Sequence, residues 1–94
     1  MTSKSSTKPI VAVVDDETIL LESWQEILAD DFDTYLFSDG LAALAHFKTH
    51  SVDVAILNIR IPGMDGLSLL KELRKLQPEV QVLMVSGHGT VEMA

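Results

Sequence analysis

Short apolar runs alternate along the chain with longer segments in which apolar and polar residues mix. The apolar runs lie at residues 10–14, 34–37, 53–57 and 81–85. Strands that read as nearly continuous apolar runs are typical of parallel sheets covered on both faces. The pattern therefore predicts four buried parallel strands.

The segments between these runs repeat apolar residues with the period of an amphipathic helix. The expected helices cover residues 18–29, 39–49, 66–77 and, as the start of a fourth helix, 89–94. Ser38 or Asp39 is placed to cap the second helix, and Asp65 to cap the third. The residues expected on the buried faces are Leu20, Trp24, Ile27 and Leu28, then Ala43, Leu44 and Phe47, then Leu69, Leu70, Leu73 and Leu76.

Strands that alternate with helices predict an α/β protein, because right-handed crossovers place the helices over a parallel sheet. The C-terminal ends of parallel strands meet at one edge of the sheet, and ligands bind there. Polar residues follow three of the predicted strands, namely Asp15, Asp16, Asn58 and Ser86. We therefore expect these four residues to share one edge of the sheet.

The length and composition indicate a single domain. The chain has 94 residues, of which 47% are hydrophobic, and a formal net charge of −7. These values are typical of one small soluble globular domain. Residues 1–9 are interpreted as a flexible leader and residues 10–94 as the domain. No apolar run approaches the roughly 20 residues that span a bilayer, and no signal peptide is recognisable, so the cytoplasm is the expected location.

The charge balance and the cysteine content exclude several kinds of chemistry. The chain has 14 acidic and 7 basic residues, whereas binding to a phosphate backbone requires clustered cations. The chain has no cysteine, which removes disulfide and zinc–thiolate chemistry. Direct contact with nucleic acid or a membrane is therefore not expected of this segment.

Asp15 and Asp16 are adjacent carboxylates at a strand end, and they repel each other unless solvent or a cation is near. Magnesium prefers oxygen ligands, typically one or two carboxylates together with waters. The sequence therefore predicts a magnesium site formed by Asp15, Asp16 and the backbone carbonyl of Arg60, with Asn58 as a weak ligand. The alternative is that the two acids only cap the first helix, whose dipole favours negative charge at its N-terminus.

Four further polar residues allow both a functional and an ordinary structural interpretation. The Ser86 hydroxyl is placed to donate to a phosphoryl oxygen, but taken alone this dipeptide is better explained as an ordinary Ser-Gly turn. His88 has no serine or cysteine nucleophile spaced to it, and we interpret it as an exposed loop residue. His46 and His50 are four residues apart on the second helix, but a third ligand is missing and we interpret them as a solvated face.

Four fragments of the chain stand in a specific order: residues 13–17, the apolar strand leading to residue 58, residues 62–66 and residues 85–90. Together they resemble the receiver domain of bacterial two-component response regulators over residues 10–94, and the last fragment is similar to nitrogen-regulatory-type receivers. The resemblance implies a three-layer, flavodoxin-like sheet in the order 2-1-3-4-5, with magnesium at Asp15 and Asp16. It also implies phosphoryl transfer from a histidine kinase to residue 58, followed by movement of the Ser86 hydroxyl as the switch.

The chain departs from that family at two points. Residue 58 is an asparagine where the family has its phospho-accepting aspartate, and an amide has no anionic oxygen to attack phosphorus. The chain also stops before the family's fifth strand, which carries a lysine, and before its last helix. We therefore expect about four strands in the order 2-1-3-4 with three to four helices. The fourth strand would then be an open apolar edge, which favours self-association.

The leading interpretation is a receiver module of a phosphorelay that binds partners, is not phosphorylated and is not an enzyme. Its expected partners are a histidine kinase and an effector domain outside this chain, of DNA-binding type. Two rivals remain open: a degenerate receiver acting as an interaction scaffold without a metal site, and a fragment of a phosphatase-like α/β enzyme. No glycine-rich phosphate loop follows the first strand, which counts against the enzyme.

Overall fold

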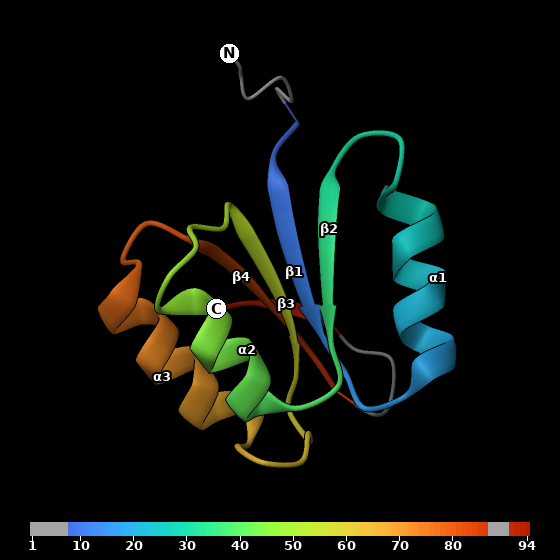
Figure 1. Cartoon of the computed structure of the whole chain (residues 1–94). Coiled ribbons are helices and arrows are strands. Elements are labelled where there is room, and N and C mark those ends of the chain that lie inside the picture. The colour runs from blue at the N-terminus through green and yellow to red at the C-terminus, as the bar shows by residue number, and fades with distance from the viewer. Residues whose placement is uncertain (1–7, 87–90) are drawn as a thin grey trace.

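The protein consists of a β-sheet between two layers of helices. The structure is a computed structural model that describes residues 8–86 and 91–94. Its elements are β1 (Ile10–Val14), α1 (Thr18–Leu28), β2 (Asp33–Phe37), α2 (Gly40–Phe47), β3 (Val54–Asn58), α3 (Gly66–Leu76), β4 (Gln81–Val85) and β5 (Val91–Met93). Helix α1 lies on one face of the sheet, and α2 and α3 lie on the other (Figure 1). Within the described ranges, no helix is long and apolar enough to cross a membrane.

The sheet has five strands in the order β2-β1-β3-β4-β5. Strands β1 to β4 are parallel to one another, and β5 is antiparallel to β4. The α/β class and the strand order 2-1-3-4 predicted from the sequence are therefore confirmed. Because β1 and β3 are adjacent and parallel, the loops that follow them emerge at the same edge of the sheet.

The apolar runs of the central strands are buried on both faces. Successive side chains of a strand point to opposite sides of the sheet. In β1, Ala12 and Val14 belong to the core beneath α2 and α3, whereas Val11 and Val13 belong to the core on the α1 side. All four side chains are at most 2% exposed. The continuous apolar run is thus explained by helices on both sides, as the sequence pattern predicted.

Two helices begin at aspartate caps. The Asp39 side chain accepts a hydrogen bond from the Ala42 amide at 2.8 Å, and the Asp65 side chain accepts one from the Ser68 amide at 2.9 Å. These bonds satisfy amide groups that have no partner within the first turn of a helix. The predicted caps Asp39 and Asp65 are therefore confirmed.

The expectation of a fourth helix at residues 89–94 is wrong for Val91–Met93, which form strand β5 beside β4. The short strand pairs with backbone groups of β4 that would otherwise lack partners along that edge. The Arg74 guanidinium donates to the carbonyls of Val80 and Ala94, which ties the segment after β5 to α3. Strand β4 is therefore not the open edge on which the expected self-association depended. Residues 1–7 and 87–90, including His88, lie outside the described residues.

Helix α1 is less buried than its apolar pattern predicted. Leu21 is its one buried residue, Trp24 and Leu28 are half-buried, and Leu20 and Ile27 are 38% and 68% exposed. The cause is that α1 packs mainly on β1 and β2, at one side of the sheet. The sheet therefore covers only part of the apolar face that the sequence predicted for α1.

The buried faces of α2 and α3 agree more closely with the sequence pattern. Ala43, Phe47, Leu69 and Leu73 are buried in the core under these helices. Leu76, which was also expected to be buried, is 42% exposed because it ends α3 beyond the packed turns.

Candidate functional site

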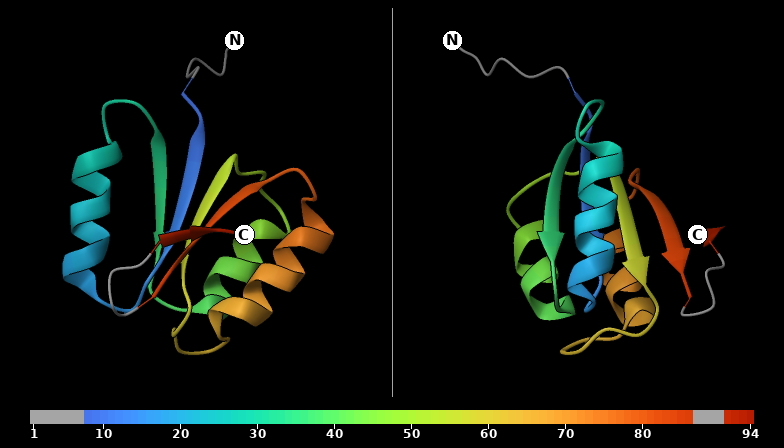
Figure 2. Two further views of the ribbon diagram at one scale, coloured as in Figure 1. Left: turned by 180° about the vertical axis from the view of Figure 1, so that it is seen from behind. Right: turned by 90° about the vertical axis from the view of Figure 1, so that its right-hand side faces the viewer.

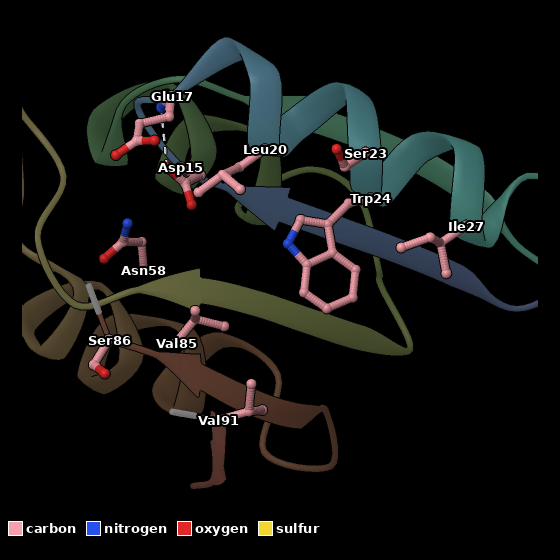
Figure 3. A pocket seen from close by; sticks show the side chains of 10 residues that line it. All are labelled: Asp15, Glu17, Leu20, Ser23, Trp24, Ile27, Asn58, Val85, Ser86 and Val91. Atoms are coloured by element: carbon pink, nitrogen blue, oxygen red, sulfur yellow. Dashed lines mark hydrogen bonds between the residues drawn. The ribbon is translucent and has the colours of Figure 1, made fainter. Parts of the chain in front are cut away.

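Asp15 and Asn58 lie at the C-terminal ends of the adjacent strands β1 and β3. The Asp15 side chain is 3% exposed and Asn58 is 9% exposed, although both are polar. They line one cavity of about 450 Å³ together with Ser86, which directly follows β4 (Figure 3). The structure therefore brings three of the residues singled out in the sequence to one site.

The polar side chains of the site are held by the loops that follow their own strands. Asp15 Oδ1 accepts a hydrogen bond from the Glu17 amide at 2.9 Å, and Asn58 Oδ1 accepts one from the Arg60 amide at 3.0 Å. The Ile59 amide donates to the Val85 carbonyl at 3.0 Å, which fixes the backbone next to Asn58. With its oxygen engaged, Asn58 directs its amide nitrogen toward the strand end that carries Asp15 and Glu17 (Figure 3).

Two of the predicted site residues, Asp16 and Arg60, are not among the residues that line the cavity. Asp16 and Arg60 are exposed and follow Asp15 and Asn58 within one or two positions. The amide of Arg60, rather than its carbonyl, makes the contact with Asn58 that is observed. Ser86 is half-buried. None of these positions contradicts the predicted ligand set, and its binding role stays a prediction.

The donor set fits a hydrated magnesium ion better than a metal enclosed by protein. Among the residues that the structure describes, no three histidine, cysteine or acidic side chains converge in a way that could hold a metal. Magnesium requires only one or two carboxylates because waters complete its octahedral shell. Asp15, buried at the strand end, and the adjacent Asp16 meet that requirement. The Asn58 oxygen already accepts the Arg60 amide, so it would be at most a weak ligand of such an ion.

Sequence reasoning missed the apolar half of the cavity and one of its acids. Leu20, Trp24 and Ile27 of α1 line one side of the cavity. Val85, the last residue of β4, and Val91, the first residue of β5, line the other side. Glu17 lines its polar end. Glu17 could have been included in the predicted site, because it is the third residue of the acidic run that starts at residue 15. No local signal pointed to the apolar wall, because it depends on the distance between α1 and β4.

The sequence of residues 11–94 matches the family described as the response regulator receiver domain. The chain belongs to this family. Solved receiver structures share its fold: it superposes on a CheY-like receiver domain protein from Methanospirillum hungatei JF-1 with a TM-score of 0.84 and 27% identity, covering 89% of this chain and 68% of that one. NtrX from Brucella abortus gives a TM-score of 0.80 and 36% identity, covering 88% of this chain and 20% of that one.

The receiver domain is also similar to part of several transcriptional regulators. It is 34% identical over 90 residues to the C4-dicarboxylate transport transcriptional regulatory protein DctD of Rhizobium meliloti strain 1021, covering 95% of this chain and 20% of that protein. It is 34% identical over 86 residues to the DNA-binding transcriptional regulator NtrC of Salmonella typhimurium, covering 90% of this chain and 18% of NtrC. The chain thus spans about a fifth of the length of these two relatives. Its similarity to NtrC and to NtrX supports the predicted nitrogen-regulatory type.

A second polar cluster of the receiver domain lies away from the acidic site, between α2 and β2. The rings of His46 and His50 stack with centroids 4.4 Å apart, and the centroid of the His46 ring also lies 5.1 Å from that of Tyr35 and 5.0 Å from that of Phe37. The Nε2 atom of His46 is buried and has no hydrogen-bond partner among the described residues. His46 is therefore partly enclosed, contrary to the interpretation of both histidines as a solvated face.

This enclosure predicts a loss of stability in mild acid. Burial lowers the pKa of His46, and the neighbouring His50 lowers it further. Because the folded pKa lies below the unfolded value of about 6.5, folding favours the neutral ring. The stabilisation is complete above that value and is lost as the pH falls through the folded pKa. We expect urea midpoints to decline from pH 7 to pH 5, and His46→Gln to flatten the decline; an unchanged slope in this variant would contradict the assignment.

Proposed function

We propose that this receiver domain works in a two-component phosphorelay in a form that does not accept a phosphoryl group. The observation that carries the proposal is the position of Asn58, buried beside Asp15 at the ends of adjacent strands. In this proposal the domain acts in the cytoplasm and exchanges signals by binding a histidine kinase and an effector outside the present chain. The name of NtrC, a DNA-binding transcriptional regulator, supports an effector of that kind.

The chemistry of the amide supports the absence of turnover. A carboxylate at residue 58 would have an anionic oxygen that can attack phosphorus, whereas the amide nitrogen has its lone pair in resonance. The Asn58 oxygen accepts the Arg60 amide, so a hydrogen-bond donor already occupies it. Family membership favours this signalling function over the phosphatase-like enzyme that the sequence also allowed.

Exposure to acetyl phosphate and magnesium tests the proposed inertness. We expect the intact mass of the protein to show no added phosphoryl group, because residue 58 offers no nucleophilic oxygen. A receiver domain with aspartate at the equivalent position, treated in parallel, should gain one phosphoryl group and thus shows that the donor is active. A phosphoryl group found on residue 58 of this chain by peptide mapping would contradict the proposal.

We also propose that the protein retains a weak magnesium site at Asp15 and Asp16, supported by the position of Asp15 in the cavity and by the acidic residue that follows it in the chain. The backbone carbonyl of Arg60 and the Asn58 oxygen are the further ligands that we propose. The bound ion would offset the negative charge of the strand ends. The Ser86 hydroxyl lines the same cavity, and we propose that it is the phosphoryl-sensing hydroxyl of the site, a role it could exercise only if residue 58 were able to carry a phosphoryl group.

Trp24 gives a direct readout of this ion, because it is the one tryptophan of the chain and lines the same cavity as Asp15. We expect magnesium in the millimolar range to change its fluorescence, and Asp15→Asn to remove most of that response. Asp31→Asn is the matched control, since Asp31 is exposed in the turn between α1 and β2. A protein that does not respond, or an Asp15→Asn variant that responds fully, would favour the scaffold without a metal site.

A further inference from the structure

The turn at the end of α2 brings two imidazole rings together. His46 lies in the last turn of α2, and the His50 amide donates to the His46 carbonyl at 2.9 Å, which continues the helical spacing past the end of the helix. The two rings are stacked, with centroids 4.4 Å apart and planes 3° from parallel. Helix α2 lies on the face of the sheet opposite α1 (Figure 2), so the pair is separate from the cavity that contains Asp15 and Asn58.

The two histidines line a cavity of their own beside the edge strand β2. The cavity has a volume of about 330 Å³, and its other lining residues are Ile10, Tyr35, Thr49 and Ser51. Three of these four residues carry a hydroxyl group. Because one water occupies about 30 Å³, the cavity has room for an ion together with several waters.

One ring nitrogen of the pair lacks a hydrogen-bond partner. The Nε2 atom of His46 is buried, and no group among the described residues donates to it or accepts from it. A buried polar atom without a partner costs free energy, and in a native protein it requires an explanation such as a bound ion or water. A neutral imidazole with its proton on Nδ1 carries a lone pair on Nε2. This nitrogen of His46 is therefore available as a metal ligand.

Thr49 favours the corresponding tautomer of His50. The Thr49 hydroxyl donates to the His46 carbonyl at 3.3 Å, and this carbonyl can only accept. The same hydroxyl oxygen lies 2.8 Å from Nδ1 of His50, so it accepts the proton of that nitrogen. His50 thus has its proton on Nδ1 and its lone pair on Nε2. Metal-binding histidines are usually held in this way, with the second ring nitrogen donating to an oxygen of the protein.

The separation of the rings suits a shared ion. Two imidazoles on one ion, with N–metal distances of about 2.1 Å and an angle of about 90° to 109°, have ring centroids roughly 4.5 to 5.5 Å apart. The observed separation of 4.4 Å is close to this range. Stacked rings direct their in-plane lone pairs side by side, so binding requires the rings to turn about their Cβ–Cγ bonds. This torsion is soft in histidine, and the His50 side chain is exposed.

We propose that His46 and His50 form a chelate site for a divalent transition-metal ion of the class that prefers imidazole, namely Cu²⁺, Ni²⁺ or Zn²⁺. The two Nε2 atoms are the protein ligands, and waters in the cavity complete the coordination shell. Cu²⁺ binds more tightly than Ni²⁺ or Zn²⁺, as the general order of these ions requires.

The site differs in strength and in chemistry from other metal sites. Within the described residues, no third histidine, cysteine or acidic side chain joins the pair, so the site binds more weakly than a zinc centre with three or four protein ligands. Its nitrogen ligands also distinguish it from the oxygen ligands that we propose for magnesium. The inference does not rest on the proposed function of the domain.

Calorimetric titration with Zn²⁺ and with Cu²⁺, in the presence of millimolar magnesium, tests the proposal. Magnesium competes for oxygen ligands, so that the titration reports the imidazoles. We expect one ion per chain. His46→Gln and His50→Gln should each weaken binding at least about tenfold, because a single imidazole remains and the chelate is lost. His88 is the third histidine of the chain, and His88→Gln is the matched control that should bind like the parent.

Two further measurements distinguish a chelate from separate imidazoles. Electron paramagnetic resonance of the Cu²⁺-loaded parent should show two coupled imidazole nitrogens, and His50→Gln should show one. The pair has its spacing only in the folded turn, so Zn²⁺ should raise the melting temperature of the parent and of His88→Gln but not that of His50→Gln. His50 is exposed, so its variant should melt like the parent when no metal is present.

Four outcomes would overturn the proposal. The first is the absence of Zn²⁺ and Cu²⁺ binding to the parent. The second is equal affinity of the parent, His46→Gln and His50→Gln, and the third is a loss in His88→Gln as large as the loss in His50→Gln. The fourth is one ion per two chains, which would assign the ion to a bridge between copies.

Discussion

The variant Asn58→Asp is expected to melt at a lower temperature than the parent protein when divalent ions are chelated. The substitution places a second carboxylate at a buried strand end beside Asp15, where Asp15 and Asn58 are 3% and 9% exposed. Two carboxylates in one poorly solvated site repel each other, and each is costly to desolvate. We expect a loss of about 1 to 3 kcal/mol, which for a domain of this size corresponds to a shift on the order of 10 °C.

Magnesium should narrow this difference, because it binds the folded site with three acids more tightly than the parent site. An ion at ten times its dissociation constant adds about 1.4 kcal/mol to the free energy of unfolding. Calorimetric melts of both proteins in chelator and in magnesium therefore measure the effect. Gln25→Glu is the matched control, since it makes the same amide-to-acid change on the exposed side of α1 and should shift stability by less than about 0.5 kcal/mol. An Asn58→Asp protein that is equally or more stable in chelator would show that residues 15, 16 and 58 do not form one acidic site.

Gly66→Ala is expected to be strongly destabilising although alanine is the better helix former. A Cβ atom at residue 66 would lie 2.8 Å from the Ile59 Cα atom and still closer to the Asn58 carbonyl oxygen. Both are backbone atoms, and the Gly66 amide donates to the Ile59 carbonyl at 2.8 Å, so neither side can move away freely. Overpacking of this kind costs about 3 kcal/mol, which exceeds the gain of at most about 1 kcal/mol from replacing glycine in a helix.

The Gly66 variant also tests how the site is built, because the contact is with the backbone of Asn58 itself. A displaced residue 58 should weaken the magnesium response of Trp24 as well as the fold. Leu67→Ala, one position further along α3 and 53% exposed in the parent, is the control and should be close to neutral in urea unfolding. If Gly66→Ala proved as stable as the parent, the close approach of α3 to the end of β3 would be refuted.

Most of the fold could be predicted from the sequence because its determinants are local. The apolar runs of β1, β3 and β4 indicated burial on two faces, and Asp39 and Asp65 marked the starts of α2 and α3. Each of these signals depends on residues within one or two turns of each other. Alternation of strands and helices then restricted the topology to a parallel sheet.

The candidate site was predictable in its polar half only. Asp15, Asn58 and Ser86 each follow a predicted strand, and parallel topology brings such positions to one edge. The apolar half, with Trp24 of α1 opposite Val91 of β5, joins residues far apart in the chain. The misjudged segment at residues 91–93 shows the same limit. Three residues carry too little periodicity to distinguish a helix from a strand, and the unpaired edge of β4 decided between them.

The sequence by itself determined the chemistry of residue 58, since an amide lacks an anionic oxygen in any surroundings, and it determined which residues alternate between apolar and polar. Only the tertiary structure decided which apolar positions are covered. Leu21 is buried while Leu20 and Ile27 on the same helix stay exposed, because α1 reaches β1 and β2 but leaves the part of the sheet at β3 to β5 uncovered. Periodicity states that a face is apolar, whereas burial depends on whether another element lies against that face.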